Sequence, residues 1–192
     1  MVDNATPADS AAAPQKPLHY LGIPLIAGAY LTLKLPAILA AGDWITLTRA
    51  LALIGFGYVA AYTDLRARIV ANKLVLAMLA AWLLIMAVYV LTDIEGATGL
   101  LAPSLIGCAA GGGFFLVMYL VSGKGIGGGD IKLITVIGLF LTFTKLMPML
   151  FVSSLLTALV AGGLLLTKRA TMKTAITLVP FLYVGILVVL FT

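Results

Sequence analysis

Two aspartates, Asp64 and Asp130, are the residues whose type and position could support chemistry in this sequence. Asp130 follows a run of three glycines, Gly127, Gly128 and Gly129, and an apolar segment begins directly after it. Because glycine lets another backbone approach closely and tolerates positive φ, such a run before a carboxylate is typical of an active-site loop. Asp64 lies at the end of an earlier apolar run. Two carboxylates that share one proton can hydrolyse a peptide bond, so the pair predicts an aspartyl protease.

The composition places these residues in a membrane protein. Of 192 residues, 62% are hydrophobic and 10% are charged, whereas soluble domains are roughly 45–50% apolar and about 25% charged. A spanning helix takes about 20 apolar residues, so six or seven spans would use nearly the whole chain. The predicted fold class is therefore all-α, a polytopic transmembrane bundle of six to seven helices without a separate soluble domain.

Seven apolar runs are candidate spans, at about 18–41, 45–63, 74–91, 98–121, 131–143, 146–166 and 175–191. The first run contains Lys34, Pro24 and Pro36, so a re-entrant or interfacial segment stays open beside an extra N-terminal span. Residues 1–17 are rich in Ala, Pro and small polar residues, which predicts a flexible tail. The tail lacks the basic region of a cleavable signal peptide, so we expect residues 18–192 to form the membrane domain.

Lysines and arginines predict how the bundle is oriented. They gather in the turns after the second, fourth and sixth runs, as Arg66, Arg68, Lys73, Lys124, Lys132, Lys168, Arg169 and Lys173. By the positive-inside rule these turns and the N-terminus face the cytoplasm, in the plasma or inner membrane. The same placement accounts for the net charge of +5 without a nucleic-acid partner.

The acidic residues can then be sorted by side. Five of the seven lie in the tail or in the outward turns: Asp3, Asp9, Asp43, Asp93 and Glu95. Only Asp64 and Asp130 remain at the cytoplasmic ends of spans, in turns separated by one helical hairpin. A bundle could bring these two side chains together without crossing the membrane.

Each acid also has a purely structural interpretation. Asp130 could be a helix N-cap after a glycine turn, and Asp64 could be an interfacial acid paired with Arg66 or Arg68. Residues 127–129 could accept an extended substrate segment through main-chain hydrogen bonds. Lys132 and Arg66 could hold this loop or meet a substrate charge, and they could equally be snorkelling anchors.

Other motifs carry less chemistry. Cys108 and His19 are the only residues of their types, so we expect no metal site and no cofactor. Gly107 and Gly111 form a GxxxG pair that predicts close helix packing. The glycines of segment 123–128 formally match GxGxxG, but no strand precedes them, so we reject a nucleotide site.

Two segments resemble the type IV prepilin leader peptidases, which belong to the GxGD class of intramembrane aspartyl proteases. One is GGGDIKL at 127–133, and the other is DLRARIVAN at 64–72. The second segment matches the family pattern Asp-Leu-Arg-x-Arg-Arg-Ile-Pro-Asn at Asp64, Leu65, Arg66, Arg68 and Asn72. It departs at Ile69, Val70 and Ala71, and the loss of the proline loosens the expected turn without touching the acids. A weaker match lies at Val179, Pro180 and Phe181, and the whole resemblance covers about residue 55 to the C-terminus.

The resemblance implies that the chain cleaves short basic leaders from prepilin-like precursors that carry a hydrophobic N-terminal helix. It implies that Asp64 and Asp130 are catalytic, and we expect Arg66, Arg68, Asn72, Lys132 and Gly127–Gly129 to bind substrate or support the two acids. Longer family members add a cytoplasmic domain with paired cysteines and methylate the new N-terminus. Here we expect the short form without methylation, as used for Flp or Tad-type pilins or archaeal flagellin-like proteins.

Three alternatives stay open at this point. Presenilin and signal peptide peptidase share the GxGD motif class. They carry Tyr before the first acid, whereas this chain has Thr63, and they carry a Pro-Ala-Leu motif that this sequence lacks. A small transporter could use the two aspartates to relay protons or bind a cation, although its site would usually lie near the midplane. A non-catalytic pilus assembly factor could keep the same fold.

Overall fold

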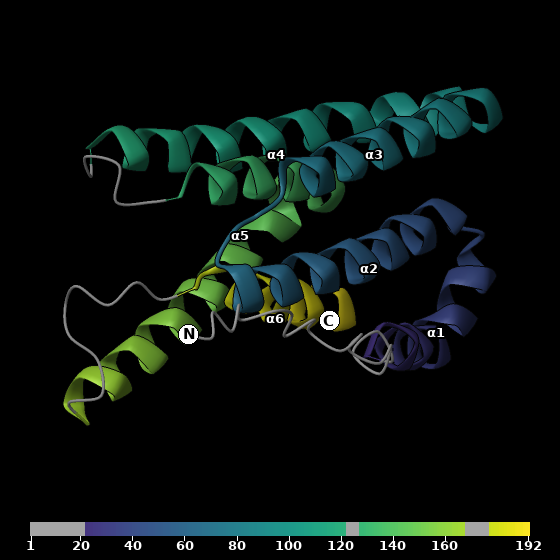
Figure 1. The fold of residues 1–192 in the computed structure, drawn as a ribbon. Helices are drawn as coiled ribbons and strands as arrows, with labels where there is room; N and C mark the ends of the chain where they lie inside the picture. The colour runs from purple at the N-terminus through teal and green to yellow at the C-terminus, as the bar shows by residue number, and fades with distance from the viewer. Residues whose placement is uncertain (1–21, 122–126, 168–176) are drawn as a thin grey trace, which may run out of the picture.

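The computed structural model describes residues 22–121, 127–167 and 177–192, and within these ranges it is entirely helical (Figure 1). The six helices are α1 (Gly22–Ala41), α2 (Trp44–Ala67), α3 (Asn72–Thr92), α4 (Ile94–Val121), α5 (Gly128–Leu166) and α6 (Val179–Phe191). Of these, α2 to α5 are long and apolar enough to cross a membrane. The prediction of an all-α polytopic bundle is confirmed, and the predicted tail at residues 1–17 lies outside the described residues.

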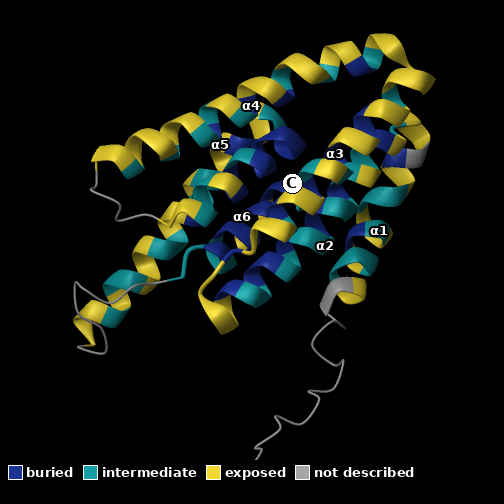
Figure 2. Ribbon diagram, turned by 45° about the horizontal axis from the view of Figure 1, so that its top comes forward, coloured by how far each residue is buried: buried dark blue, intermediate teal, exposed yellow. Residues whose placement is uncertain are grey.

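The helices form two pairs with α5 between them. In Figure 1, α3 and α4 lie side by side, α2 lies along α6, and the ribbon of α5 passes from one pair to the other. Buried residues concentrate where α2, α5 and α6 meet, whereas the outer face of α4 is largely exposed (Figure 2). The exposed side chains include large apolar ones such as Leu84, Phe114, Leu120 and Phe151. Hydrocarbon lipid tails would cover such a surface, which fits a membrane protein.

Helix α5 joins two of the predicted runs but is broken between them. Thr142 has non-helical backbone angles, φ 62° and ψ 169°, so α5 consists of two halves, 128–141 and 143–166. The ribbon bends sharply and its second half turns away from α4 (Figure 1). The sequence predicted two runs here, with the first starting at residue 131. The structure starts that helix three residues earlier, because the glycine segment itself is helical from Gly128 onward.

The GxxxG pair of α4 packs against this broken helix. A Cβ atom added to Gly107 would lie 2.5 Å from the Gly138 oxygen and 2.8 Å from the Thr142 carbonyl carbon. A Cβ atom on Gly111 would meet Ile134 and Leu146, one residue from each half of α5. The prediction of close helix packing at these glycines is therefore confirmed.

Helix α1 packs at the far end of α2 and α6. Tyr30 makes an edge-to-face contact with Phe191, with ring centroids 5.7 Å apart, and Lys34 Nζ donates a hydrogen bond to the Thr192 oxygen at 3.3 Å. The turn into α2 uses Gly42 at φ 67°, a left-handed conformation that favours glycine. The apolar part of α1, Pro24–Ile38, and the 13 residues of α6 are both shorter than the four long helices.

Candidate active site

Asp64 lies in the last turn of α2 and is 6% exposed. Its carbonyl accepts a hydrogen bond at 2.8 Å from the N–H of Arg68, which ends the helix in a left-handed conformation at φ 52°. Its carboxylate accepts a hydrogen bond at 3.3 Å from the N–H of Val179, the first residue of α6. The first N–H groups of a helix have no partner inside the helix, so the start of α6 is suited to hold this acid.

Asp130 lies in the first turn of α5 and is partly buried. The N-cap of α5 is Gly127, in an extended conformation, and Asp130 is the third helical residue. The interpretation of Asp130 as the N-cap is therefore wrong by three positions. A Cβ atom on Gly127 would lie 3.1 Å from Asp130 Oδ2, so a side chain at residue 127 would crowd the carboxylate. A larger residue at position 127 would therefore require the Asp130 carboxylate to shift.

The two segments that carry the acids touch each other. A Cβ atom on Gly129 would lie 3.1 Å from the Val70 Cβ, so the glycine run packs against the turn that follows Asp64. Lys132 Nζ donates a hydrogen bond to Asn72 Oδ1 at 3.2 Å. Lys132 and Asn72 were expected to support the site from separate motifs, and the structure brings them into direct contact.

The carboxylates of Asp64 and Asp130 are close enough to interact electrostatically. They come from the C-terminal end of α2 and the N-terminal end of α5, which lie at the same end of the bundle. Asp64 is the more deeply buried of the two. When two carboxylates lie near each other in a site of low dielectric, a charge on one disfavours ionisation of the other.

The remaining predicted residues surround this pair at the surface. The Arg66 guanidinium stacks over the ring of Tyr62, 4.9 Å from its centroid, and Arg68 is near enough to Asp64 for a favourable charge interaction. Gly128 is exposed, and a Cβ atom on it would meet nothing within 4 Å. The side of Gly128 is therefore open, unlike the sides of its two glycine neighbours.

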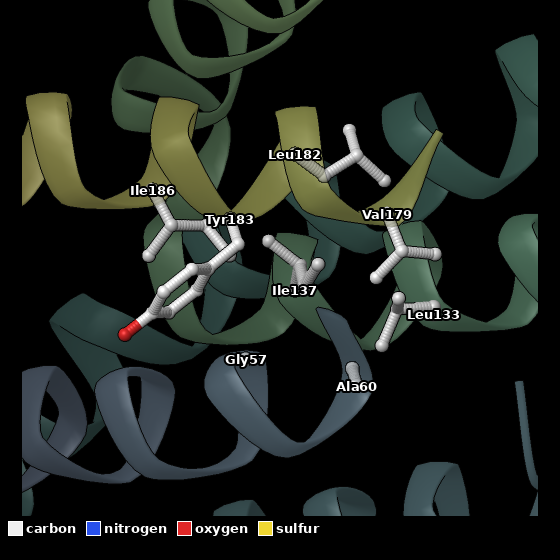
Figure 3. Close-up of a pocket in the computed structure, with 8 residues that line it drawn as sticks. All are labelled: Gly57, Ala60, Leu133, Ile137, Val179, Leu182, Tyr183 and Ile186. Atoms are coloured by element: carbon white, nitrogen blue, oxygen red, sulfur yellow. The ribbon is translucent and has the colours of Figure 1, made fainter. Parts of the chain in front are cut away.

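The core beside Asp64 is apolar and tightly packed. Helices α2, α5 and α6 enclose a cavity of about 10 Å³, room for about one water molecule. Figure 3 shows the lining side chains, with the Tyr183 hydroxyl pointing away from the others. The lining comprises Gly57, Ala60, Leu133, Ile137, Val179, Leu182, Tyr183 and Ile186. Apart from the Tyr183 hydroxyl, the side chains that line this region beside Val179 are apolar.

Two larger hollows open on the outside of α5. One, of about 510 Å³, lies between α4 and α5 and includes Phe114, Phe143 and Phe151. The other, of about 290 Å³, lies between α5 and α6 and reaches Leu178 and Leu182. Because Leu178 precedes Val179, the second hollow ends beside the helix start that holds Asp64.

Within the described ranges, no group of three or more His, Cys, Asp or Glu side chains is arranged to hold a metal ion. Together with the all-helical bundle, the paired acids at one end define a polytopic membrane protein with a carboxylate site.

Comparison with known proteins gives the family. Residues 51–162, more than half of the chain, match the type IV leader peptidase family, and the chain belongs to that family. Both acids lie inside the matched range. The resemblance predicted from the two motifs is confirmed, and the match favours a peptidase over the transporter alternative.

A curated relative is the prepilin leader peptidase/N-methyltransferase of Bacillus subtilis (strain 168), which is 37% identical over 81 residues. The aligned part is 42% of this chain and 33% of that protein, so the chain matches about a third of the relative's length. No solved structure matches the chain.

The sequence did not reveal the partner of Asp64. The weak match at Val179, Pro180 and Phe181 was the available signal, and the structure gives it a physical role, because Pro180 lies at the start of α6 and the preceding N–H binds the acid.

Proposed function

We propose that this protein is an intramembrane aspartic endopeptidase that removes a short basic leader from prepilin-like precursors. The observation that carries the proposal is the pairing of Asp64, buried and bonded to the Val179 N–H, with Asp130 within electrostatic reach. Family membership supports the same reaction class.

In the proposed reaction the two carboxyls share one proton. The ionised group takes a proton from a water molecule, whose oxygen attacks the carbonyl carbon of the scissile peptide, while the protonated group donates its proton to the carbonyl oxygen. The tetrahedral intermediate then breaks at the C–N bond, and the leaving nitrogen takes up a proton from the carboxyl that received one from water. At the same time the other carboxylate takes a proton from one hydroxyl of the intermediate, whose carbon becomes the carboxyl carbon of the product. The pair is thereby returned to its singly protonated state.

The residues around the acids fit supporting roles in this reaction. The open side of Gly128 would let an extended substrate backbone lie against the loop, since a peptide bond must leave a helix before it can be attacked. The bond between Lys132 and Asn72 would hold the two acid-bearing segments together. Arg66 and Arg68 would face the aqueous side, which the positive-inside rule assigns to the cytoplasm.

For the substrate, we propose a precursor whose leader is followed by a hydrophobic helix in the membrane. The relative's name supports a prepilin-type substrate. The hollow between α5 and α6 supports this choice, since it is lined mainly by apolar side chains and ends beside the residue that bonds to Asp64. A transmembrane helix lying there would deliver the leader junction to the acids.

The test uses the purified protein in proteoliposomes with a precursor that carries a basic leader and an apolar helix, and the products are identified by mass. We expect one cleavage at the leader junction. Replacing either acid, as Asp64→Asn or Asp130→Asn, should lower the rate at least about 100-fold. Asp93→Asn is the matched control, because Asp93 caps the start of α4 at the other end of the bundle through a bond to the Gly96 N–H. Undiminished cleavage by both acid variants would refute the proposal.

A further inference from the structure

The first half of α5 has the acid at one end and a break at the other. Asp130 lies in its first turn and Thr142 ends it. The angles at Thr142 fall in a region that is essentially restricted to glycine, so surrounding contacts must hold this conformation. A helix end leaves carbonyl groups in need of donors, and the carbonyls of the last turn before Thr142 are in that position.

Two side chains from other helices supply donors at this end. The Arg49 guanidinium of α2 donates to the Phe140 carbonyl, and the Trp82 Nε1 of α3 donates to the neighbouring Leu139 carbonyl at 3.0 Å. Trp82 is 5% exposed. A cation is favoured at a helix C-terminus, where the carbonyl ends of the peptide dipoles collect. Both bonds therefore cap the half-helix 128–141.

Arg49 is an unusual residue for its place. It lies on a membrane-spanning helix, where a charged side chain is costly and is retained when it has a specific partner. Its side chain turns inward to the α5 break, and Asp43 and Tyr89 are near enough to interact with its charge. Nothing in the carboxylate chemistry uses this arginine, so its partly buried position inside the bundle needs another reason.

The geometry supplies that reason. Arg49 and Asp64 are 15 residues apart on α2, roughly 22 Å, and Asp130 and Phe140 are ten residues apart on α5, about 15 Å. At one end the two acids approach each other, and at the other end Arg49 holds the Phe140 carbonyl. Direct contacts between α2 and α5 are few, and both helices pack on α6, so this bond adds a specific polar link between α2 and α5 at the end away from the acids.

We propose that Arg49, together with Trp82, is a positioning residue for the reaction. By capping the broken end of the half-helix 128–141, the two side chains fix its position along α2 and thereby set the separation of the Asp64 and Asp130 carboxyls. The kinetic test of this inference rests on the proposed peptidase function. A second readout, the distance between the two acid-bearing segments, does not require cleavage.

The kinetic test compares Arg49→Met, which removes the donor, with Arg49→Lys, which keeps a cation, and with Trp82→Phe, which removes the ring N–H together with part of the buried ring. We expect Arg49→Met to lower kcat about tenfold with KM nearly unchanged, as for a loss of transition-state alignment. Arg49→Lys should retain part of the kcat that Arg49→Met loses, and Trp82→Phe should lower kcat less than Arg49→Met does. Lys34→Met is the matched control, because Lys34 also donates to a carbonyl at a helix end, that of Thr192, away from α5.

The second test measures the separation of the two acid-bearing segments without substrate. Spin labels at Leu65→Cys and Gly128→Cys, both exposed positions, are introduced with Cys108→Ala, which removes the native thiol. We expect one narrow distance distribution for the parent and for Lys34→Met, and a shifted or broadened one for Arg49→Met. An unchanged distribution in Arg49→Met, or an unchanged kcat in an active enzyme, would overturn the inference. If the unsubstituted protein cleaves no precursor, the proposed function fails while the distance test still decides the role of Arg49.

Discussion

Lys132 Nζ donates a hydrogen bond to Asn72 Oδ1 at 3.2 Å, and this bond joins the segment that follows Asp64 to the helix that carries Asp130. The two residues are far apart in the chain, and each lies a short distance beyond one of the acids. The bond therefore ties the two halves of the proposed active site at the surface, above the buried carboxylate of Asp64.

Removing this bond should weaken catalysis without abolishing it. A single exposed hydrogen bond contributes on the order of 1 kcal/mol, so Asn72→Leu should reduce kcat/KM about threefold to tenfold. Asn72→Asp keeps an acceptor for Lys132, so its kcat/KM should fall less than that of Asn72→Leu. If the bond is the cause, the double variant Asn72→Leu with Lys132→Met should cost no more than the more harmful single change. Additive losses in precursor cleavage would show that the residues act separately.

The three glycines before Asp130 should respond differently to alanine. Gly129→Ala would place a methyl group 3.1 Å from the Val70 Cβ, and Gly127→Ala would place one 3.1 Å from Asp130 Oδ2. Both should lower kcat, because the methyl group at residue 129 displaces the turn after Asp64 and the one at residue 127 displaces the Asp130 carboxylate. The methyl group of Gly128→Ala meets no neighbour. This variant should raise KM instead, because the methyl group takes up space where the substrate backbone is expected to lie.

A rescue variant separates crowding from other causes at Gly129. Val70→Ala makes room for the new methyl group, so it should restore part of the activity of Gly129→Ala while giving no gain to Gly127→Ala. Equal effects of Val70→Ala in both backgrounds would argue against the Val70 contact as the cause.

The packing of α4 on the break in α5 predicts a stability difference between two glycines of one helix. Gly107→Ala would force a methyl group against the Gly138 oxygen and the Thr142 backbone, so we expect it to lower the free energy of unfolding by about 1–3 kcal/mol. Gly113→Ala has open space and should raise it by about 0.5–1 kcal/mol, because alanine is the better helix former. Thermal unfolding of the two variants in the same detergent makes the comparison, and equal midpoints would contradict it.

The conformation of Thr142 predicts a stabilising substitution. Its angles are accessible to glycine with little strain, so Thr142→Gly should raise the free energy of unfolding by about 1 kcal/mol. Thr142→Val keeps the strain and branching and should not stabilise the protein. A lower melting temperature for the glycine variant than for the valine variant would contradict a strained break.

The hollow between α5 and α6 predicts an effect on substrate binding. Ala161 lines it, so Ala161→Trp should fill it and raise KM for a precursor with an apolar helix, with little change in kcat. Leu159→Trp is the control, since Leu159 lies on the same helix with 64% of its surface exposed. Equal KM values for the two variants would place the substrate helix elsewhere.

Hydropathy and charge placement were enough to predict the helical class and to single out the two acids. Water is absent from the bilayer interior, so each apolar run must satisfy its own backbone as a helix, and hydropathy alone therefore outlines α2 to α4. Charge placement then left Asp64 and Asp130 as acids at a common end. The sequence also indicated an interruption near the break in α5, because it divides that region into two apolar runs, 131–143 and 146–166.

The contacts that hold the acids come from helices that are distant in the sequence. The Val179 N–H reaches Asp64 across 115 positions of chain, and Arg49 reaches Phe140 across 91. The start of α5 at Gly128, earlier than predicted, accompanies the packing of Gly129 on Val70. No local pattern encodes such contacts, because hydropathy and propensity depend on neighbours in sequence, whereas each of these bonds depends on how whole helices pack.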